Sequence, residues 1–355
     1  MWCWIIKRRL KKISLFLLFF SIYVFIYIVN NIYVGDDIIK KFIKLLLIMI
    51  FLNPLMIYAY SPYIYAGGES IGIELKSNYI LVVGTYKING NKPNLEIGDK
   101  IISVDDIKVS NTGELSKLVQ NKKSVKVVFI RNNKLMEEKI NIINEDGVYK
   151  TGLYVKDGIM GIGTLTYVDP ETKIFGCLGH EIVEKVTKKV FEANDGTIFS
   201  SFVTKIIKSK NGNPGEKIAK FDTEKVYGNI KTNTKRGVYG NFIQDNIQKT
   251  LYKVANHDEI KLGKAQILTT INGNEISPFE INITKILNKN GDHDILFEIT
   301  DPKLLSATNG IIQGMSGSPI IQGNIIIGAV THVIVDNPIM GYGIDIKKML
   351  IEGEN

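Results

Sequence analysis

The chain has 355 residues, 45% of them hydrophobic, so it is long enough for two domains with buried cores and too apolar to be disordered. Its net charge of +8 comes from acidic and basic residues that are mixed along most of the sequence, which argues against a nucleic-acid-binding protein. The cysteines are only two, Cys3 and Cys177, which excludes a disulfide framework and a cysteine-rich metal box. We expect no metal and no cofactor.

The first 60 residues indicate a membrane anchor or signal region. Residues 13–29 are almost entirely apolar and follow the basic block 7–12, a pattern typical of a transmembrane helix or signal anchor with a cytoplasmic amino terminus. A second apolar stretch, residues 42–60, has lysines at its front, and two spans would return the rest of the chain to the cytoplasm. Alternatively, this second stretch is the true signal sequence or anchor, and the start lies too far upstream.

Residues 67–145 have the short apolar alternations of a β-rich domain. The order of the predicted elements resembles a PDZ domain, above all through the run Gly98-Asp99-Lys100-Ile101-Ile102-Ser103-Val104. The elements are strands at 80–83, 95–104, 107–109 and 125–130 and a short helix at 112–120. In PDZ domains a loop at the position of Ser70, Ile71, Gly72 and Ile73 offers backbone amides to a peptide carboxylate. The alternative is a β-rich spacer without a ligand.

Residues 149–355 are predicted as a third region, made of many short strands separated by turn residues. No long helical periodicity interrupts them before the last dozen residues. This pattern indicates an all-β barrel or sandwich.

The run Gly314-Met315-Ser316-Gly317-Ser318-Pro319 is the strongest functional motif in this third region. A nucleophilic serine needs a turn that exposes its hydroxyl, and glycines allow such a turn. The backbone amides of Gly314 and Ser316 would then form an oxyanion hole. A predicted hairpin, residues 319–330, lies directly behind the serine, as in trypsin-like proteases, so we expect a trypsin-like double β-barrel.

A serine nucleophile needs a base, and His180 is the best of the four histidines. It ends a predicted hairpin of residues 161–179, and the distance to Ser316 leaves room for one barrel between them. His332 follows the strand behind the serine and is the second candidate. His257 and His293 lie in polar turns and are expected to be solvated.

Asp301 is the candidate for the acidic residue that would orient the base. It ends a predicted strand, residues 295–300, and precedes the nucleophile loop. Cys177 lies three residues before His180, which puts the two on opposite faces of a strand. We therefore expect Cys177 to be a small buried residue and not a nucleophile.

Several of these segments together resemble the family of stage IV sporulation protein B, the signalling serine peptidase of endospore-forming bacteria. The segments are residues 161–180, 300–319, 328–332 and 341–343. Position by position, the resemblance assigns the nucleophile to Ser316, the base to His180 and the acid to Asp301. The chain departs from the family at Cys177, where a small residue such as alanine is expected, and in its double apolar head.

The resemblance implies export into the space between the two forespore membranes, with the enzyme tethered or self-cleaved near its amino terminus. There it would cut a membrane-anchored regulator and so release an intramembrane protease that activates the late mother-cell sigma factor. The partners are thus the membrane and this regulator, with no nucleic acid. The alternatives are a PDZ scaffold with an inactive peptidase domain, or an HtrA-like stress protease, although those carry the PDZ domain after the protease.

Overall fold

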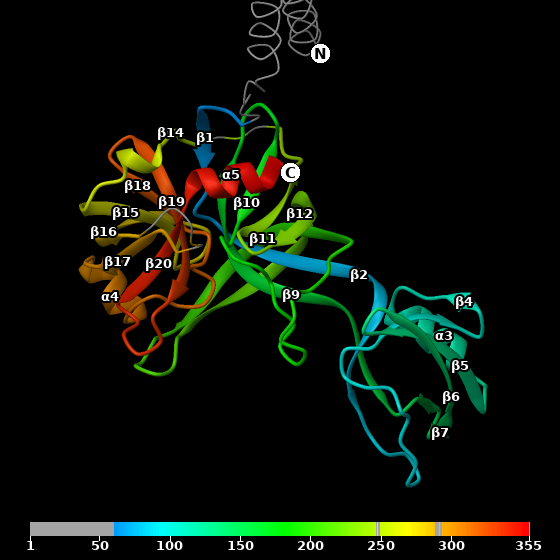
Figure 1. Cartoon of the computed structure of the whole chain (residues 1–355). Helices are drawn as coiled ribbons and strands as arrows, with labels where there is room; N and C mark the ends of the chain where they lie inside the picture. Colours follow the sequence, from blue (N-terminus) through cyan, green and yellow to red (C-terminus); the bar gives the residue numbers. More distant parts are fainter. Residues whose placement is uncertain (1–59, 246, 248, 288–290, 292, 355) are drawn as a thin grey trace, which may run out of the picture. The chain divides into compact units, whose positions relative to one another are not determined.

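The computed structural model describes residues 60–245, 247, 249–287, 291 and 293–354 (Figure 1). Strands dominate this part of the chain, which confirms the mainly β prediction. The membrane segments predicted within residues 1–60 lie outside the described residues, apart from Tyr60. Among the described helices, none has both the length and the apolar character needed to cross a membrane.

The first barrel is a closed ring of strands with its own core. In this ring β2 pairs with β9, β9 with β10, β10 with β13, β13 with β12, β12 with β11 and β11 with β2. The strands are β2 (Ser70–Thr85), β9 (Leu153–Val168), β10 (Ile174–Cys177), β11 (Asp195–Ile207), β12 (Glu216–Thr234) and β13 (Gly237–Phe242). Ile71, Phe175 and Ile198 are among the fully buried side chains that fill it.

The second barrel closes in the same way. Here β15 pairs with β16, β16 with β17, β17 with β20, β20 with β19, β19 with β18 and β18 with β15. The strands are β15 (Gly263–Thr270), β16 (Ile276–Ile286), β17 (Ile295–Ile299), β18 (Pro319–Gln322), β19 (Ile325–Val333) and β20 (Met340–Asp345). The helix α4 (Pro302–Thr308) connects β17 to the loop before β18, and the sequence pattern did not predict it.

Four further elements join, extend or cover the barrels. The strand β1 (Tyr63–Ala66) pairs with β9 of the first barrel and with β14 (Leu251–Val254), and β14 in turn runs parallel to β19 of the second. A short 3₁₀ helix, η1 (His257–Glu259), follows β14. The carboxy-terminal helix α5 (Ile346–Glu354) buries Ile346, Met349 and Leu350 against a core that includes Tyr167 and Tyr239.

A third core belongs to the small module, defined here as residues 79–155. It contains the second half of β2, the start of β9, and seven further elements. These are β3 (Lys100–Val104), β4 (Ile107–Lys108), α3 (Thr112–Val119), β5 (Ser124–Arg131), β6 (Lys134–Asn141), β7 (Ile143–Glu145) and β8 (Val148–Lys150). The helix predicted at 112–120 is therefore confirmed, and the Asn111 side chain caps its start by accepting a hydrogen bond from the Glu114 amide. Figure 1 shows β2 and β9 running between this module and the first barrel.

The structure corrects the prediction for Ser70, Ile71, Gly72 and Ile73. These residues do not form a loop: all four lie in β2 and pair with β9, and Ile71, Gly72 and Ile73 also pair with β11 on the other side. Ile71 and Ile73 point into the first barrel and are at most 1% exposed. Because both edges of the strand are already paired, its amides are not free for a peptide carboxylate, and the predicted binding role of this segment is wrong.

Candidate active site

The nucleophile turn lies directly before β18 and is held by backbone hydrogen bonds. Met315 N–H donates to the Ile312 carbonyl, Ser318 N–H to the Met315 carbonyl and Gly317 N–H to the Val330 carbonyl. Gly314 and Gly317 have φ angles of +93° and +92°, a conformation that favours glycine. A Cβ on Gly317 would lie 2.1 Å from the Thr164 carbonyl oxygen, so no other residue fits there.

Thr164, on β9 of the first barrel, clamps this turn from the opposite side. Its N–H donates to the Ser316 carbonyl at 3.0 Å, and its Oγ1 donates to the Gly314 carbonyl at 2.7 Å. Thr166 adds a hydrogen bond from its hydroxyl to the Gly317 carbonyl at 2.8 Å. The glycines flanking the serine are therefore fixed by both barrels.

Ser316 and His180 line the same cavity, which has a volume of about 800 Å³. In this structure the Ser316 hydroxyl donates to the Thr331 carbonyl at 2.8 Å. Catalytic hydrogen bonds are often formed only when substrate is bound, so this orientation is compatible with a nucleophile at rest.

His180 follows β10 after two residues in the left-handed region. Leu178 has a φ of +69° and Gly179 a φ of +72°. This conformation is strained for a leucine, at a cost of about 1–3 kcal/mol. The Leu178 side chain is buried in the first-barrel core, which compensates for the strain and fixes the direction in which His180 leaves the strand.

The protonation of His180 follows from its hydrogen bond. Its Nδ1 lies 2.8 Å from the Glu181 carbonyl oxygen, which can only accept, so Nδ1 carries the proton and Nε2 is free to act as a base. Burial lowers the pKa of His180, and the Glu181 carbonyl opposes this only in part. Within the described residues, no carboxylate is hydrogen-bonded to the His180 ring.

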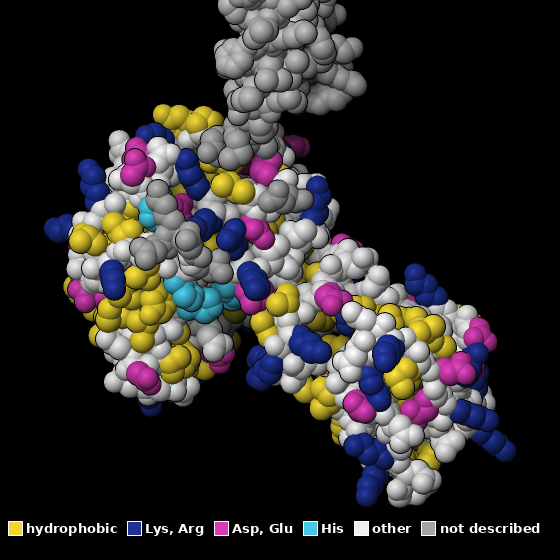
Figure 2. Space-filling model, viewed as in Figure 1, with side chains coloured by type: hydrophobic (Ala, Val, Ile, Leu, Met, Phe, Trp, Pro, Cys, Tyr) yellow, Lys and Arg dark blue, Asp and Glu magenta, His cyan; other side chains and the backbone are white. Residues whose placement is uncertain are grey.

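His180 belongs to a cluster of three imidazole rings. Figure 2 shows most of the visible histidine surface gathered in one patch. The ring centroid of His180 lies 4.9 Å from that of His332, and His332 lies 5.0 Å from His293. His293 is exposed, as expected, and its ring stacks on Tyr342. Burial and the two neighbouring imidazoles lower the pKa of His332 to about 4, so this ring is neutral at pH 7.

These histidines do not form a metal site. Among the described residues, no group of three or more His, Cys, Asp or Glu side chains could hold a metal ion. His257, the other histidine expected to be solvated, instead lies with its Nδ1 3.0 Å from an Asp345 carboxylate oxygen.

Asp301 is not brought to the cavity that contains Ser316 and His180. It caps α4: one carboxylate oxygen accepts from the amides of Lys303 and Leu304, and the other from the amide of Glu280 at 3.3 Å. The helix leads into the nucleophile loop, so Asp301 fixes the approach to Ser316. Its role as the catalytic acid stays a prediction.

The N–H groups of Gly314 and Ser316 are free to donate hydrogen bonds to an oxyanion. Neither N–H donates to another group within the described residues. The Gln313 carbonyl accepts from Lys217 N–H at 3.0 Å, and the N–H and C=O of a trans peptide point in opposite directions. This bond therefore turns the Gly314 N–H away from β12, where Lys217 lies.

The Lys217 side chain is a feature that the sequence did not reveal. It is 2% exposed, its Nζ lies 3.1 Å from Thr269 Oγ1 and 3.5 Å from Thr164 Oγ1, and its stem packs against Gly314. Burial lowers its pKa to about 7. Lys217 is one of 44 Lys and Arg residues and lies beside a turn, so nothing in the sequence marks its side chain as buried.

Cys177 is fully buried, as predicted. Its Sγ contacts the Val238 carbonyl oxygen at 3.5 Å, and burial raises the pKa of its thiol, which excludes a thiolate nucleophile at neutral pH.

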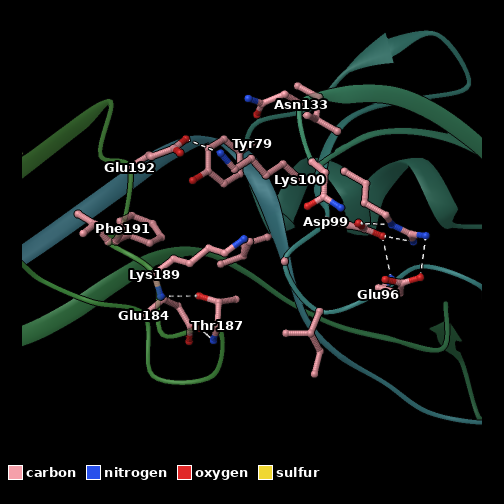
Figure 3. A pocket seen from close by; sticks show the side chains of 17 residues that line it. Tyr79, Glu96, Asp99, Lys100, Asn133, Glu184, Thr187, Lys189, Phe191 and Glu192 are labelled. Atoms are coloured by element: carbon pink, nitrogen blue, oxygen red, sulfur yellow. Dashed lines mark hydrogen bonds and ion pairs between the residues drawn. The ribbon is translucent and has the colours of Figure 1, made fainter.

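A second cavity, of about 210 Å³, lies between the small module and the segment that follows His180 (Figure 3). Its charged groups are largely paired with one another: Lys100 with Glu192, and Arg131 with Asp99 and Glu96. These pairs leave few free charges for a ligand, and we assign this cavity none.

A serine hydrolase site needs a nucleophile, a base and hydrogen-bond donors for the oxyanion. The cavity offers a glycine-flanked serine, a neutral histidine and two N–H groups without an acceptor among the described residues. The family model described as SpoIVB peptidase S55 matches residues 147–350, more than half of the chain. The chain therefore belongs to the SpoIVB peptidase S55 family and is a serine peptidase. Comparison with curated proteins gives no significant match.

Proposed function

We propose that the protein is a serine endopeptidase in which Ser316 is the nucleophile and His180 the general base. The observation that carries this proposal is the shared cavity. Ser316 and His180 are far apart in sequence and belong to different barrels, yet both line one cleft. Beside them lie the N–H groups of Gly314 and Ser316, which have no acceptor among the described residues.

In the proposed reaction, Ser316 Oγ turns from the Thr331 carbonyl to His180 Nε2 and attacks the peptide carbonyl carbon. Nε2 takes the hydroxyl proton, and the oxyanion is held by the amides of Gly314 and Ser316. Nε2 then returns the proton to the leaving amine as the C–N bond breaks. Water, deprotonated by the same nitrogen, hydrolyses the acyl-enzyme.

Hydrogen bonding to the Glu181 carbonyl would orient the imidazole and stabilise its cation, a part usually played by a carboxylate. The acidic role that the family resemblance gives to Asp301 would then act through α4, because its carboxylate already accepts three amide hydrogen bonds.

We also propose that the two closed rings are a trypsin-like double β-barrel and that the small module is a PDZ-like peptide-binding domain. The ring-closing pairs and the separate core of the module support these assignments. The module would hold a substrate segment or restrain the enzyme before maturation.

In the cell, the protein would be anchored by its apolar amino-terminal segment and exported to the space between the forespore membranes. There it would cleave a membrane-anchored regulator of an intramembrane protease, and also itself, during sporulation. The amino-terminal residue of the protein recovered from sporulating cells tests this proposal, and a catalytic domain facing the cytoplasm would contradict it.

A fluorophosphonate probe tests the catalytic assignment. We expect wild-type protein to be labelled and Ser316→Ala to remain unlabelled, with peptide cleavage reduced at least about 1,000-fold. Ser318→Ala is the matched control: its buried hydroxyl has no hydrogen-bond partner in the described structure, so labelling should persist. If folded wild-type protein does not label, the chain is a scaffold with an inactive peptidase domain.

A further inference from the structure

One edge of β9 is unpaired where it passes the candidate active site. On one side, β2 pairs with β9 from Leu153 to Thr164. On the other side, the described partner β10 reaches only Leu165, Tyr167 and Val168, whereas β1 lies on the same side of β9 as β2. The segment 156–163 therefore has a strand on one side only.

The register shows which backbone groups this edge presents. Thr164 N–H donates to the Ser316 carbonyl, and the Thr164 carbonyl accepts from Leu178 N–H. Both backbone groups of Thr164 therefore point away from β2. Pairing with β2 continues without a shift from Ser70↔Thr164 to Lys76↔Gly158. In an antiparallel ladder alternate residues point the same way, so Ile162, Met160 and Gly158 direct their N–H and C=O groups to the unpaired side.

These groups have no backbone partner within the described residues, and all of them belong to the cavity that contains Ser316 and His180. The last outward-pointing residue, Thr164, is bonded to the nucleophile turn itself. An unpaired edge normally has to be covered, because it pairs readily with another chain. Here it ends at the reactive serine.

The face of the strand beside this edge is also open. A Cβ built on Gly161 would meet no atom within 4 Å, although Gly161 lines the cavity. Its lack of a side chain thus leaves room next to the edge for a side chain from another molecule.

We propose that the polypeptide substrate binds as an added β-strand on the edge of β9, with main-chain hydrogen bonds to Ile162 and Met160 and a side chain over Gly161. This inference rests on the proposed function and specifies its substrate class: extended, unfolded segments without proline at the paired positions. A folded domain would present no such strand.

The test uses Met160→Pro, which removes the outward N–H, and Met160→Ala, which keeps it. Proline is tolerated on an edge whose N–H is unpaired. Gly161→Val keeps the N–H and fills the open space, and Gly161→Ala is its smaller counterpart. Each protein is assayed with a fluorophosphonate, which needs only the nucleophile, and with a mixture of peptides from a digested proteome, read by mass spectrometry.

We expect Met160→Pro and Gly161→Val to lower peptide kcat/KM by about 5-fold to 10-fold, mainly through KM. Fluorophosphonate labelling should stay within about 3-fold of wild type. Met160→Ala keeps the main-chain donor, so its peptide kcat/KM should fall less than about half as far as that of Met160→Pro. Wild-type peptide cleavage by both variants would overturn the inference, as would a wild-type enzyme that labels but cleaves no extended peptide. Failure of wild-type labelling would instead reject the proposed function.

Discussion

The base His180 starts from a neutral imidazole, because burial lowers its pKa. A base works in its unprotonated form, so activity should rise with pH, and the midpoint of this rise should lie below about pH 6.5, the usual histidine value. The pH profile of kcat/KM, or of fluorophosphonate labelling, measures this. An ascending limb centred above pH 7 would contradict the assigned environment of the ring.

Lys217 predicts an unusual dependence of stability on pH. Its pKa is lowered by burial to about 7 in the folded state, whereas an unfolded lysine keeps a value near 10.4. Between these values the unfolded chain binds more protons than the folded one, so this residue makes stability rise with pH. Below about pH 7 the folded protein carries a buried ammonium with no carboxylate partner among its described hydrogen bonds.

Lys217→Met should therefore be more stable than wild type at pH 6, on the order of 2 kcal/mol, with the difference shrinking towards pH 10. Urea unfolding at both pH values measures this, with the exposed Lys220→Met on the same strand as control. A simultaneous fall in labelling of Ser316 would show that the buried cation serves the nucleophile turn. Equal destabilisation at both pH values would refute the burial argument.

Among the structural elements, α4 depends on its cap for its position. Asp301→Ala removes the acceptor for the Lys303 and Leu304 amides and should lower the free energy of unfolding by about 1–2 kcal/mol. Asp301→Asn keeps a side-chain acceptor and should lose less than about half of that. A loss of kcat in Asp301→Asn without a loss of stability would identify the catalytic role that the family resemblance predicts.

Some elements can be predicted from the local sequence pattern, and others cannot. The helix at 112–120 and the hairpin behind Ser316 were predicted correctly, because turn residues and apolar alternation mark them locally. The alternation in the segment Ser70–Ile73 fits a loop-and-strand motif as well as a single strand, so the sequence alone leads to the wrong assignment there. Only its pairing with β11, more than 100 residues away in sequence, decides between them.

In the molecule as a whole, the barrels and the small module have separate cores. Phe129→Ala, in the core of the small module, should cost about 3–5 kcal/mol and loosen that module. The barrels should remain closed. Cys177 reports on this, since its buried thiol reacts only when the first barrel opens.

In a pulse of thiol reagent, Cys177 should stay protected in Phe129→Ala and become reactive in Phe175→Ala, which lies in the same core as the cysteine. Mass spectrometry assigns the modified peptide. Equal exposure of Cys177 in both variants would show that the module and the first barrel unfold together.

By itself, the sequence determined the β class, the glycine-flanked Ser316, the candidate base His180 and the membership of the protein in its family, because these depend on local motifs. The tertiary structure decided the rest. It placed Asp301 at a helix start, joined Lys217 and Thr164 to the nucleophile turn, and left the edge of β9 open beside Ser316. Each of these depends on pairing between residues distant in the chain, for which the periodicity of a single segment carries no information.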